Sequence, residues 1–596
     1  MLRKLLICGT AALALVSAVA GPAAGATKRA LMPGVTYTRA VQFTPHGPVA
    51  LHVVTGPKPT GLYELRPVLS NDRIQGVERV TAMQKRLSDQ ATMVGVNGDF
   101  FNLDSGRPSG VLVRDGVVES PPNGDRSSVG VTPTGTLDVR RVEFFGTWKG
   151  LGQRRALNDV NELPGPNGIS LFTPSYGPAT PAQPGAVEAV IAPFPPSAPN
   201  TDLTGPVVHL TSGGGTAIPA GGAVLVARGT AGQKLAEEAP IGTTLALRLI
   251  FRPEWSEVSQ AIGGGPVIVR DGSPVFRSLE AFEPSQLLPR NPRTAVGQLR
   301  NGRILLVATD GRRPGYSVGM TNFELAQTMV RLGAVTASAF DGGGSTSLAF
   351  DGELLNRPAG SDERAVSTSL QLMYYGVYTP VPAPVVSPNG DGVDETQALS
   401  YKVVRPSTVT VTLRAPGGGV AFTETVAREP GTYEVAFPPL PADPAAEPAP
   451  PAEGRWELDV SATDDVGRTS QTRERFAVNN TIGFVKLARK RIVVRPRGKQ
   501  FQQAGVTLTR PARLTVTVET RSGVRVATIA NQRAKKGRFL VRWRGTTRGG
   551  RLFAYGGDYV LRFRASNSLG VAELASRPFK LVRAKPVPKK QPKRRR

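Results

Sequence analysis

Short runs in which apolar and polar residues alternate recur along most of the chain and predict β-strands. The segments "TVTVTL" (408–413) and "LTVTV" (514–518) are typical, because every second residue is apolar and would face the same side of a sheet. Few segments have the longer period of a helix. The pattern predicts an α+β domain with a mixed sheet and few helices, followed by two all-β domains.

One segment, 321–333, has the spacing of an amphipathic helix. Its apolar face would contain Leu325, Met329 and Leu332. Thr321 and Glu324 have the spacing of a capping box at its start, and Gly333 is placed to end it. We therefore expect Glu324 to cap the helix rather than to take part in catalysis.

The two predicted all-β domains are related to each other. The segment "GRWELDVSATDDVG" (454–467) aligns with "GDYVLRFRASNSLG" (557–570), and "RPSTVTVTL" upstream of the first matches "RPARLTVTV" upstream of the second. We expect β-sandwiches over residues 386–480 and 481–582, after a Pro-rich linker at 379–395 and before a basic tail at 583–596. The sandwiches resemble the immunoglobulin-like domain of flagellar hook-cap proteins and of many exported bacterial enzymes, which "SPNGDG" commonly opens.

That opening loop also contains candidate ligands for calcium. Asn389, Asp391 and Asp394 could supply oxygen atoms. The complete calcium-loop series is missing, however, so we expect a plain turn.

The first 26 residues have the features of a secretory signal peptide. Arg3 and Lys4 precede an apolar run, and Ala24, Gly25 and Ala26 form a small-residue cleavage site. The single cysteine, Cys8, lies inside this segment, so the mature chain would contain no disulfide. No later apolar stretch is long enough to span a bilayer. We expect a secreted protein at or beyond the cell surface.

The net charge of +27 is concentrated in the last fifth of the chain. From Thr481 onward there are 31 Lys and Arg against three acidic residues, an excess of 28, whereas the preceding residues have 42 basic and 43 acidic side chains. On an exported protein, such a region would attract anionic cell-surface polymers rather than nucleic acid. The alternative is a solvated basic region without a specific partner.

Several common catalytic arrangements are absent from the sequence. The three histidines are not paired for zinc binding, and no G-x-S-x-G elbow, Walker A loop or complete Rossmann fingerprint occurs. Asp-Gly pairs are the remaining sequence feature that could mark a functional site. Three of them lie between apolar runs and are expected to form hairpin turns: Asp115, Asp271 and Asp351.

Two further Asp-Gly pairs do not have the pattern of hairpins. Asp310 follows the predicted strand 304–309 and precedes the helix, and Asp341 follows the predicted strand 335–340 and precedes three glycines. A strand–helix–strand order predicts a βαβ unit whose strands end at one edge of a sheet, where ligands bind in open α/β folds. Glycine N–H groups can form an anion site there. These two aspartates are our candidates for a functional site.

Six blocks of sequence then resemble, in order, the phosphodiester glycosidases related to the lysosomal uncovering enzyme. They are "GVNGDFF" (95–101), "GGGPVIVRDG" (263–272), "NPRTAVG" (291–297), "VATDGRRPGYSVGMTNFELAQTMVRLGAV" (307–335), "FDGGGSTSL" (340–348) and "ERAVSTSL" (363–370). The resemblance implies a domain over 27–378, with a variable insertion at about 131–261. It also implies hydrolysis of a sugar-1-phosphate diester with release of the sugar.

The resemblance implies that the site contains the polar residues that match the family by position: Asn97, Arg293, Thr294, Asp310, Asp341, Ser345 and Arg364. Arg293 and Arg364 would hold the phosphate, together with the N–H groups of Gly342, Gly343 and Gly344. Asp341 and Asp310 would supply the nucleophile or the base, in an order that stays open, and Asn97 would hold a sugar hydroxyl or the attacking water.

Some alternatives stay open at this point. Arg293 could pair with a buried aspartate, and Asn97 could be only a turn former. Asp99 stands where the lysosomal relative has glycine, so no catalytic role is inherited, although it could support the site. No cofactor is expected, but either of the two candidate aspartates could bind a divalent cation. The competing functions are a phosphodiesterase that cleaves P–O and a non-catalytic polysaccharide-binding scaffold.

Overall fold

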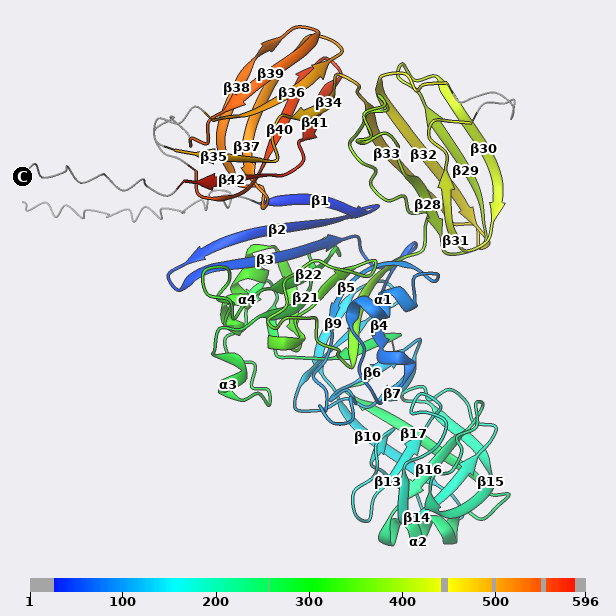
Figure 1. The fold of residues 1–596 in the computed structure, drawn as a ribbon. Helices are drawn as coiled ribbons and strands as arrows, with labels where there is room; N and C mark the ends of the chain where they lie inside the picture. Colours follow the sequence, from blue (N-terminus) through cyan, green and yellow to red (C-terminus); the bar gives the residue numbers. More distant parts are fainter. Residues whose placement is uncertain (1–25, 256, 441–448, 496–499, 548–553, 585–596) are drawn as a thin grey trace, which may run out of the picture. The chain divides into compact units, whose positions relative to one another are not determined.

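The computed structural model describes residues 26–255, 257–440, 449–495, 500–547 and 554–584 (Figure 1). The expected signal peptide and nearly all of the expected basic tail lie outside these residues. The chain divides into two compact units, 1–374 and 375–596. Strands dominate both units and four α-helices are present among the described residues, so the expected fold class is confirmed. No helix in the described ranges combines the length and apolar character needed to cross a membrane.

The first unit is built around an eight-stranded sheet in which all neighbouring strands are antiparallel. Its strands, in spatial order, are β1 (Thr27–Met32), β2 (Val35–Thr44), β3 (Gly47–Gly56), β22 (Ile304–Thr309), β21 (Arg293–Leu299), β23 (Ala334–Ala339), β19 (Val267–Arg270) and β20 (Ser273–Pro274). Helix α4 (Asn322–Arg331) packs on β19, β21 and β23 through Leu325, Ala326 and Met329. This packing forms the core next to the candidate site.

The start of α4 has the expected cap. Thr321 Oγ1 accepts the N–H of Glu324, and the Glu324 carboxylate accepts the N–H of Thr321, so the capping box is confirmed. Gly333 follows the helix with φ of 92°, a conformation that favours glycine. Glu324 therefore caps the helix, as predicted.

Two five-stranded sheets complete the part of the unit that holds the site. One consists of β25 (Glu353–Leu354), β24 (Leu348–Phe350), β5 (Thr92–Asn97), β26 (Thr368–Tyr374) and β4 (Tyr63–Leu69), and α1 (Val80–Arg86) packs on β5 and β24. The other consists of β7 (Val117–Ser120), β6 (Leu112–Arg114), β18 (Gln260–Gly263), β8 (Ser127–Val131) and β9 (Leu137–Arg141). Strand β5 is buried along its whole length and ends at Asn97.

The three expected hairpin turns are confirmed. Asp115, Asp271 and Asp351 have φ of 52°, 51° and 48°, and each is followed by a glycine with positive φ. The strand registers leave two-residue loops at all three places, between β6 and β7, β19 and β20, and β24 and β25. Each of these aspartates is therefore a turn residue.

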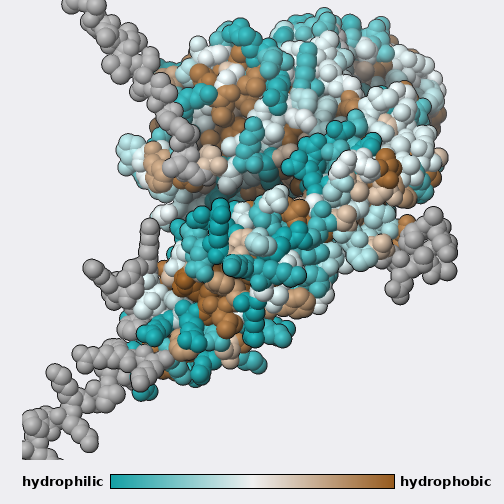
Figure 2. Space-filling view, turned by 90° about the horizontal axis from the view of Figure 1, so that it is seen from above, coloured by the Kyte–Doolittle hydropathy of each residue, from teal (hydrophilic) through white to brown (hydrophobic). Residues whose placement is uncertain are grey.

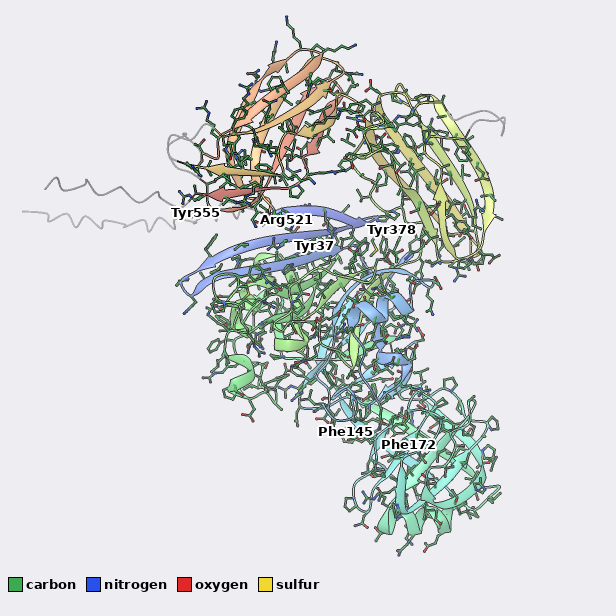
Figure 3. The ribbon with its side chains drawn as sticks, in the orientation of Figure 1. Tyr37, Phe145, Phe172, Tyr378, Arg521 and Tyr555 are labelled. Carbon is green, nitrogen blue, oxygen red and sulfur yellow. The ribbon has the colours of Figure 1, made fainter. Side chains whose placement is uncertain are left out.

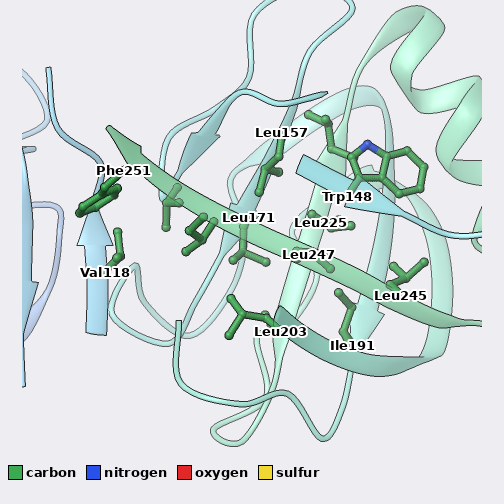
Figure 4. Close-up of a cluster of buried hydrophobic side chains, with 14 of the residues drawn as sticks. Val118, Trp148, Leu157, Leu171, Ile191, Leu203, Leu225, Leu245, Leu247 and Phe251 are labelled. Atoms are coloured by element: carbon green, nitrogen blue, oxygen red, sulfur yellow. The ribbon is translucent and has the colours of Figure 1, made fainter. Parts of the chain in front are cut away.

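The segment expected as an insertion forms a sheet with its own core. Its strands are β11 (Arg155–Leu157), β10 (Glu143–Lys149), β17 (Thr244–Arg252), β15 (Asp202–Gly214), β14 (Ala182–Ile191), β16 (Ala223–Ala227), β13 (Ile169–Phe172) and β12 (Asp159–Val160). Figure 4 shows the buried side chains of this core, among them Trp148, Leu225 and Leu247. Helix α2 (Gly229–Glu238) packs on β14 and β16.

The second unit contains two β-sandwich modules with the same strand order. The first has β27 (Val385–Val386), β33 (Thr469–Val478), β32 (Gly454–Asp464), β29 (Ser407–Arg414) and β30 (Val420–Arg428), with β28 (Leu399–Val403) and β31 (Gly431–Val435) in a second sheet. The second has β35 (Arg491–Val494), β42 (Phe579–Arg583), β40 (Gly557–Asn567), β37 (Ala512–Thr520) and β38 (Arg525–Ala534), with β41 (Gly570–Ala575) paired to β40. Its opposing sheet is β34 (Ile482–Leu487), β36 (Gln502–Leu508) and β39 (Gly537–Trp543).

The repeat in the sequence corresponds to these modules. Val409 on β29 pairs with Ala462 on β32, and Leu514 on β37 pairs with Ala565 on β40, so the two modules have the same register. Part of the expected linker is ordered, because β27 pairs in parallel with β33. The "SPNGDG" loop is a turn in which Asn389 and Asp391 side chains accept N–H groups of the same loop.

Apolar side chains on the surface are scattered. On the face of the molecule shown in Figure 2, hydrophilic residues surround small hydrophobic patches. Individually exposed side chains such as Phe145, labelled in Figure 3, belong to this background. A single exposed apolar side chain of this kind needs no functional explanation by itself.

We predict that Leu247→Ala lowers the free energy of unfolding of the first unit by about 2–5 kcal/mol, because the fully buried side chain leaves a cavity in the insertion core. Ile241→Ala is the control, since Ile241 is 65% exposed, and we expect a change within about 0.5 kcal/mol. Urea denaturation followed by tryptophan fluorescence measures both. Equal effects of the two substitutions would contradict the packing described here.

Candidate active site

Two strand ends bring the candidate aspartates to one edge of the eight-stranded sheet. Strands β22 and β23 lie on either side of β21, and both are antiparallel to it, so they run parallel to each other. Helix α4 connects them, which confirms the predicted strand–helix–strand unit. Asp310 directly follows β22 and Asp341 follows β23 by two residues. Their side chains nevertheless have different surroundings.

Asp341 lies at a cavity of about 300 Å³. Of the residues predicted from the sequence, six line it: Arg293, Asp341, Gly342, Gly343, Gly344 and Arg364. The structure adds further side chains to the wall, including Phe100, Phe282, Asn291, Arg312 and Asn322. This volume is at the lower end of the range for small-molecule sites.

The glycine turn allows two guanidinium groups to approach the backbone. A β-carbon at Gly344 would lie 2.6 Å from Cζ of Arg364, and one at Gly343 would lie 2.9 Å from an Nη of Arg312. Gly343 also has φ of 61°, which glycine adopts without strain. Its N–H donates to Pro292 O at 2.9 Å, so this N–H is not free for a ligand. The turn therefore serves mainly to bring Arg312 and Arg364 close to Asp341.

Arg293 lines the same cavity but its hydrogen bonds go to the backbone. The guanidinium donates to the carbonyl oxygens of four residues: Gln286, Leu287, Pro289 and Met320. No ion pair with a carboxylate is found for it in the described part of the chain, in contrast to the alternative that it pairs with a buried aspartate. Burial and the charge of Arg312 lower the pKa of Arg293 to about 10. Arg293 thus orders the loop around α3 (Pro284–Leu287) and places a positive charge at the cavity wall.

Asn97 connects the segments beneath the cavity. Its Nδ2 donates to Asp341 O at 2.7 Å, and its Oδ1 accepts from Thr294 Oγ1 at 2.8 Å and from Ser347 N at 3.1 Å. Asn97 and Thr294 are fully buried. These contacts occupy the polar atoms of the Asn97 amide, so its role here is to hold the glycine turn against β5 and β21.

Asp341 is the carboxylate that faces the cavity. Burial raises its pKa, while the nearby Ser345 hydroxyl and the Arg364 guanidinium act in the opposite direction. Ser345 Oγ is itself fully buried, and it makes no hydrogen bond of acceptable geometry with the residues that the structure describes. The site thus contains a carboxylate of raised pKa surrounded by cationic groups.

Asp99 is a second carboxyl group with a raised pKa. Its two oxygens accept the N–H groups of Phe100 at 2.8 Å and Gly110 at 2.7 Å. Burial raises the pKa of Asp99 to about 7, and the charge of Asp341 adds to the rise. A β-carbon at Gly263 would lie 2.2 Å from an oxygen of Asp99, so this glycine is needed for the close approach. Asp99 supports the Phe100 segment rather than lining the cavity.

Asp310 lies in a different polar network and is not among the residues that line the cavity. Its carboxylate is bound by His52 Nε2 at 2.9 Å, Tyr316 Oη at 2.7 Å and the N–H of Arg357 at 2.9 Å. His52 Nδ1 in turn lies 2.7 Å from the hydroxyl of Tyr37, which Figure 3 labels on β2.

The environment of Asp310 keeps its carboxylate ionised. Burial favours the neutral form, but the hydrogen bonds from His52, Tyr316 and the Arg357 N–H outweigh it, and the pKa of Asp310 is lowered. Ser317 Oγ also donates to the Asp310 carbonyl oxygen. Asp310 thereby fixes the path of the loop that carries Arg312.

An aromatic wall opposes the arginines and was missed in the sequence. The rings of Phe100 and Phe282 are 5.5 Å apart, and the Arg126 guanidinium lies 5.2 Å and 4.6 Å from their centroids. Arg126 also contributes positive charge near Asp341. Asn322, 9% exposed, also lines the cavity, and its buried amide oxygen has no hydrogen-bond partner in the described ranges. Phe100 lies in the motif "GDFF" and Arg312 in the motif "DGRRPG". These two motifs were the sequence features that could have identified both residues as part of the site.

Metal binding was the remaining alternative for the aspartates. Among the described residues, no group of three or more His, Cys, Asp or Glu side chains is arranged to hold a metal ion. The charged side chains near Asp341, Arg364 and Arg126, are cationic, and the Ser345 hydroxyl is the side-chain oxygen beside it.

We predict that Asp99 titrates near pH 7 in the folded protein. Because its folded pKa lies above its usual value, the folded state binds this proton more tightly, and the free energy of unfolding should fall as pH rises from about 4 to 7. Carboxyl-carbon NMR with Asp99→Asn as the assignment control measures the titration. The variant should also lose this component of the pH dependence of stability. A midpoint near 4 would contradict the assignment.

Comparison with known proteins finds a family match over part of the site. Residues 202–373 match the model of the family described as phosphodiester glycosidase. The match begins within the expected insertion and contains Arg293, Arg312, Asp341 and Arg364, whereas Asn97 precedes it.

Individual relatives are more distant. The SPbeta prophage-derived uncharacterized protein YomE of Bacillus subtilis is 31% identical over 107 residues, which cover 18% of this chain and 16% of that protein. A hypothetical protein from Synechocystis is 27% identical, with a TM-score of 0.49 and coverage of 57% of this chain and 62% of that one.

Two further solved structures are similar to parts of the chain. A putative exported protein from Burkholderia pseudomallei is 24% identical, with a TM-score of 0.46 and coverage of 55% and 74%. The catalytic domain of zebrafish N-acetylglucosamine-1-phosphodiester alpha-N-acetylglucosaminidase, auto-inhibited by its pro-peptide, is 13% identical, with a TM-score of 0.32 and coverage of 58% and 87%. On the evidence of the family match, this chain contains, in residues 202–373, a segment of the phosphodiester glycosidase family.

Proposed function

We propose that the protein is a secreted hydrolase that cleaves the glycosidic C1–O bond of a sugar-1-phosphate diester in a surface polysaccharide or glycoconjugate. The observation that carries this proposal is the cavity that Asp341 lines together with Arg293, Arg312 and Arg364. Its position in a segment that matches the phosphodiester glycosidase family supports the same function.

The charges of the cavity suit a phosphodiester. Arg293 has a pKa lowered to about 10 by burial and by the repulsion of Arg312, so an anion bound between them would relieve both effects. Arg364 lies against Gly344 on the other side of the turn. We assign the phosphate contacts to Arg312 and Arg364, because guanidinium forks match phosphate oxygens, and we assign to Arg293 a longer-range attraction.

The opposite wall suits a sugar. Phe100 and Phe282 present aromatic surface, against which the apolar face of a sugar ring can pack. The unpaired oxygen of Asn322 can accept a hydrogen bond from a sugar hydroxyl. A substrate with its sugar at this wall and its phosphate at Arg312 and Arg364 would place C1 near Asp341.

Asp341 would then act directly on the reaction. In the hydrolysis, the C1–O bond breaks, its electron pair stays with the bridging oxygen of the departing phosphomonoester, and a water oxygen bonds to C1. Asp341 either takes the proton of that water or attacks C1 first; this order stays open. The leaving group is an anion that the arginines stabilise, so it requires little help from a general acid. We assign Asp310 as a residue that positions the loop carrying Arg312.

Secretion and the surface location follow from the sequence, as part of this proposal. The segment 1–26 has the pattern of a signal peptide, and the basic region after Thr481 would attract anionic polymers. The natural substrate would then be a phosphate-linked glycan of such a polymer.

We predict that Asp341→Asn lowers kcat/KM on soluble sugar-1-phosphate methyl diesters between roughly 10² and 10⁴-fold, because the carboxylate acts on the reacting atoms. The matched control is Asp271→Asn, which exchanges the same groups at an exposed hairpin turn where Asn also adopts positive φ. The control should keep parental activity. If the parent and both variants leave every diester in the panel intact, the non-catalytic scaffold is the better description.

We predict that Arg312→Ala or Arg364→Ala raises KM about tenfold, through loss of a charge-assisted hydrogen bond to phosphate. Arg270→Ala, at an exposed hairpin position, is the matched control and should leave KM unchanged. Steady-state kinetics on the same diester measure all three. Unchanged KM in both site variants would argue against phosphate binding at the glycine turn.

Hydrolysis in oxygen-18 water distinguishes C–O from P–O cleavage. We expect the label in the released sugar, because Asp341 is placed to direct water to C1. Label in the phosphate would instead identify a phosphodiesterase.

A further inference from the structure

The three-stranded sheet of the second sandwich module has an unusual outer surface. Along β39, Phe539, Val541 and Trp543 point toward the core, so the alternate residues Arg538, Leu540 and Arg542 point outward. Leu540 is 49% exposed between the two arginines. The strand thus presents a cation, an apolar side chain and a second cation in a row.

Neighbouring strands extend this surface. Strand β36 aligns Gln503 with Arg542, Gly505 with Leu540 and Thr507 with Arg538, and β34 aligns Lys486 with Gly505. Lys486 is exposed, as are Arg538 and Arg542. We call this set of outward residues the β39 face: Lys486, Gln503, Thr507, Arg538, Leu540 and Arg542.

The β39 face has no acidic residue. The acidic residues after Thr481 are Glu519, Asp558 and Glu573, and they lie on β37, β40 and β41 of the opposing sheet. There they pair with arginines of the same sheet, Arg562 with Glu519 at 2.9 Å and Arg564 with Glu573 at 3.4 Å. One sheet is therefore partly neutralised, whereas the β39 face contains only cations and neutral residues. An acidic side chain that contacts its sheet is Asp391, which accepts the N–H of Phe484 on β34 at 2.7 Å.

The cations of the β39 face are available for an external anion. Lys486, Arg538 and Arg542 form no ion pair with any described residue. Arg542 donates to Gln503 Oε1 at 3.1 Å and lies 5.0 Å from the centroid of Phe501, which holds its guanidinium flat along the sheet. The backbone of a sheet is already ordered, so its outer surface can bind an extended polymer without ordering a loop first.

We propose that the β39 face binds an anionic polysaccharide, independently of the cavity in the first unit. Successive outward residues on a strand are about 7 Å apart, so Arg538 and Arg542 are about 13 Å apart with Leu540 between them. A polysaccharide with spaced carboxylate or phosphate groups alternates anions with apolar sugar faces in the same manner. Nucleic acid carries a charge every ~3.4 Å along each strand, a density that this face does not match.

This binding would hold the protein on the polymer while the first unit acts. It would depend on salt, because the exposed charges are screened at higher ionic strength. It would also depend on Leu540, whose apolar contact salt does not screen.

The test uses the full chain and two matched triple variants. K486A/R538A/R542A removes three cations from the β39 face, and R491A/R513A/K580A removes three exposed cations from the opposing sheet. Residues 585–596 remain in all proteins, so their basic side chains contribute equally. The probes are polygalacturonate and phosphorylated dextran, with neutral dextran as the reference, at low and high salt.

We expect the β39-face variant to bind both anionic polymers about tenfold more weakly and the control variant to change less than about twofold. Leu540→Ser should weaken binding while leaving its salt dependence unchanged. Equal losses in the two triple variants would overturn the proposal, because net charge alone would then explain binding. Absence of binding by the parent, or tighter binding of single-stranded DNA or anionic lipid vesicles through the same residues, would also overturn it.

Discussion

The candidate site depends on one buried side chain, the amide of Asn97. It donates to the carbonyl oxygen of Asp341 and accepts from Thr294 Oγ1 and Ser347 N, so one side chain at the end of β5 connects two sheets and the glycine turn. Thr294 and Ser347 are buried, and loss of the amide would leave several polar groups unpaired in the interior. The geometry of Asp341 therefore follows from the packing of the sheets rather than from the flexibility of a loop.

The second constraint is the balance of charge around that turn. The guanidinium groups of Arg312 and Arg364 approach the backbone closely at Gly343 and Gly344, because glycine has no β-carbon. Burial and the charge of Arg312 lower the pKa of Arg293, and burial raises the pKa of Asp341. The repulsion between Arg293 and Arg312 is the part of these shifts that a bound anion would relieve. We propose that a phosphodiester with an attached sugar would match these charges and the aromatic side chains of Phe100 and Phe282.

Local patterns in the sequence were sufficient for the turns, the capped helix and the repeated sandwiches, because these depend on residues close along the chain. They also placed Asp310 and Asp341 at one edge of the sheet. They could not distinguish the two, because the difference depends on His52, which binds Asp310, and on Tyr37, whose hydroxyl contacts His52. Both residues come from strands far away in the sequence. Arg293 is a similar case. An arginine can bind phosphate, but the Arg293 guanidinium donates its hydrogen bonds to backbone carbonyl groups around α3, which the sequence did not predict. The assignments of Asn97, Arg293 and Asp310 to catalysis or substrate binding remain predictions.

The most direct test of the central claim is a crystal structure with a non-hydrolysable sugar-1-phosphonate ester. The account predicts the phosphonate oxygens within hydrogen-bond distance of Arg312 and Arg364, the sugar against Phe100 and Phe282, and C1 next to the Asp341 carboxylate. A ligand bound with its phosphonate away from both arginines, or bound beside Asp310 instead, would contradict it.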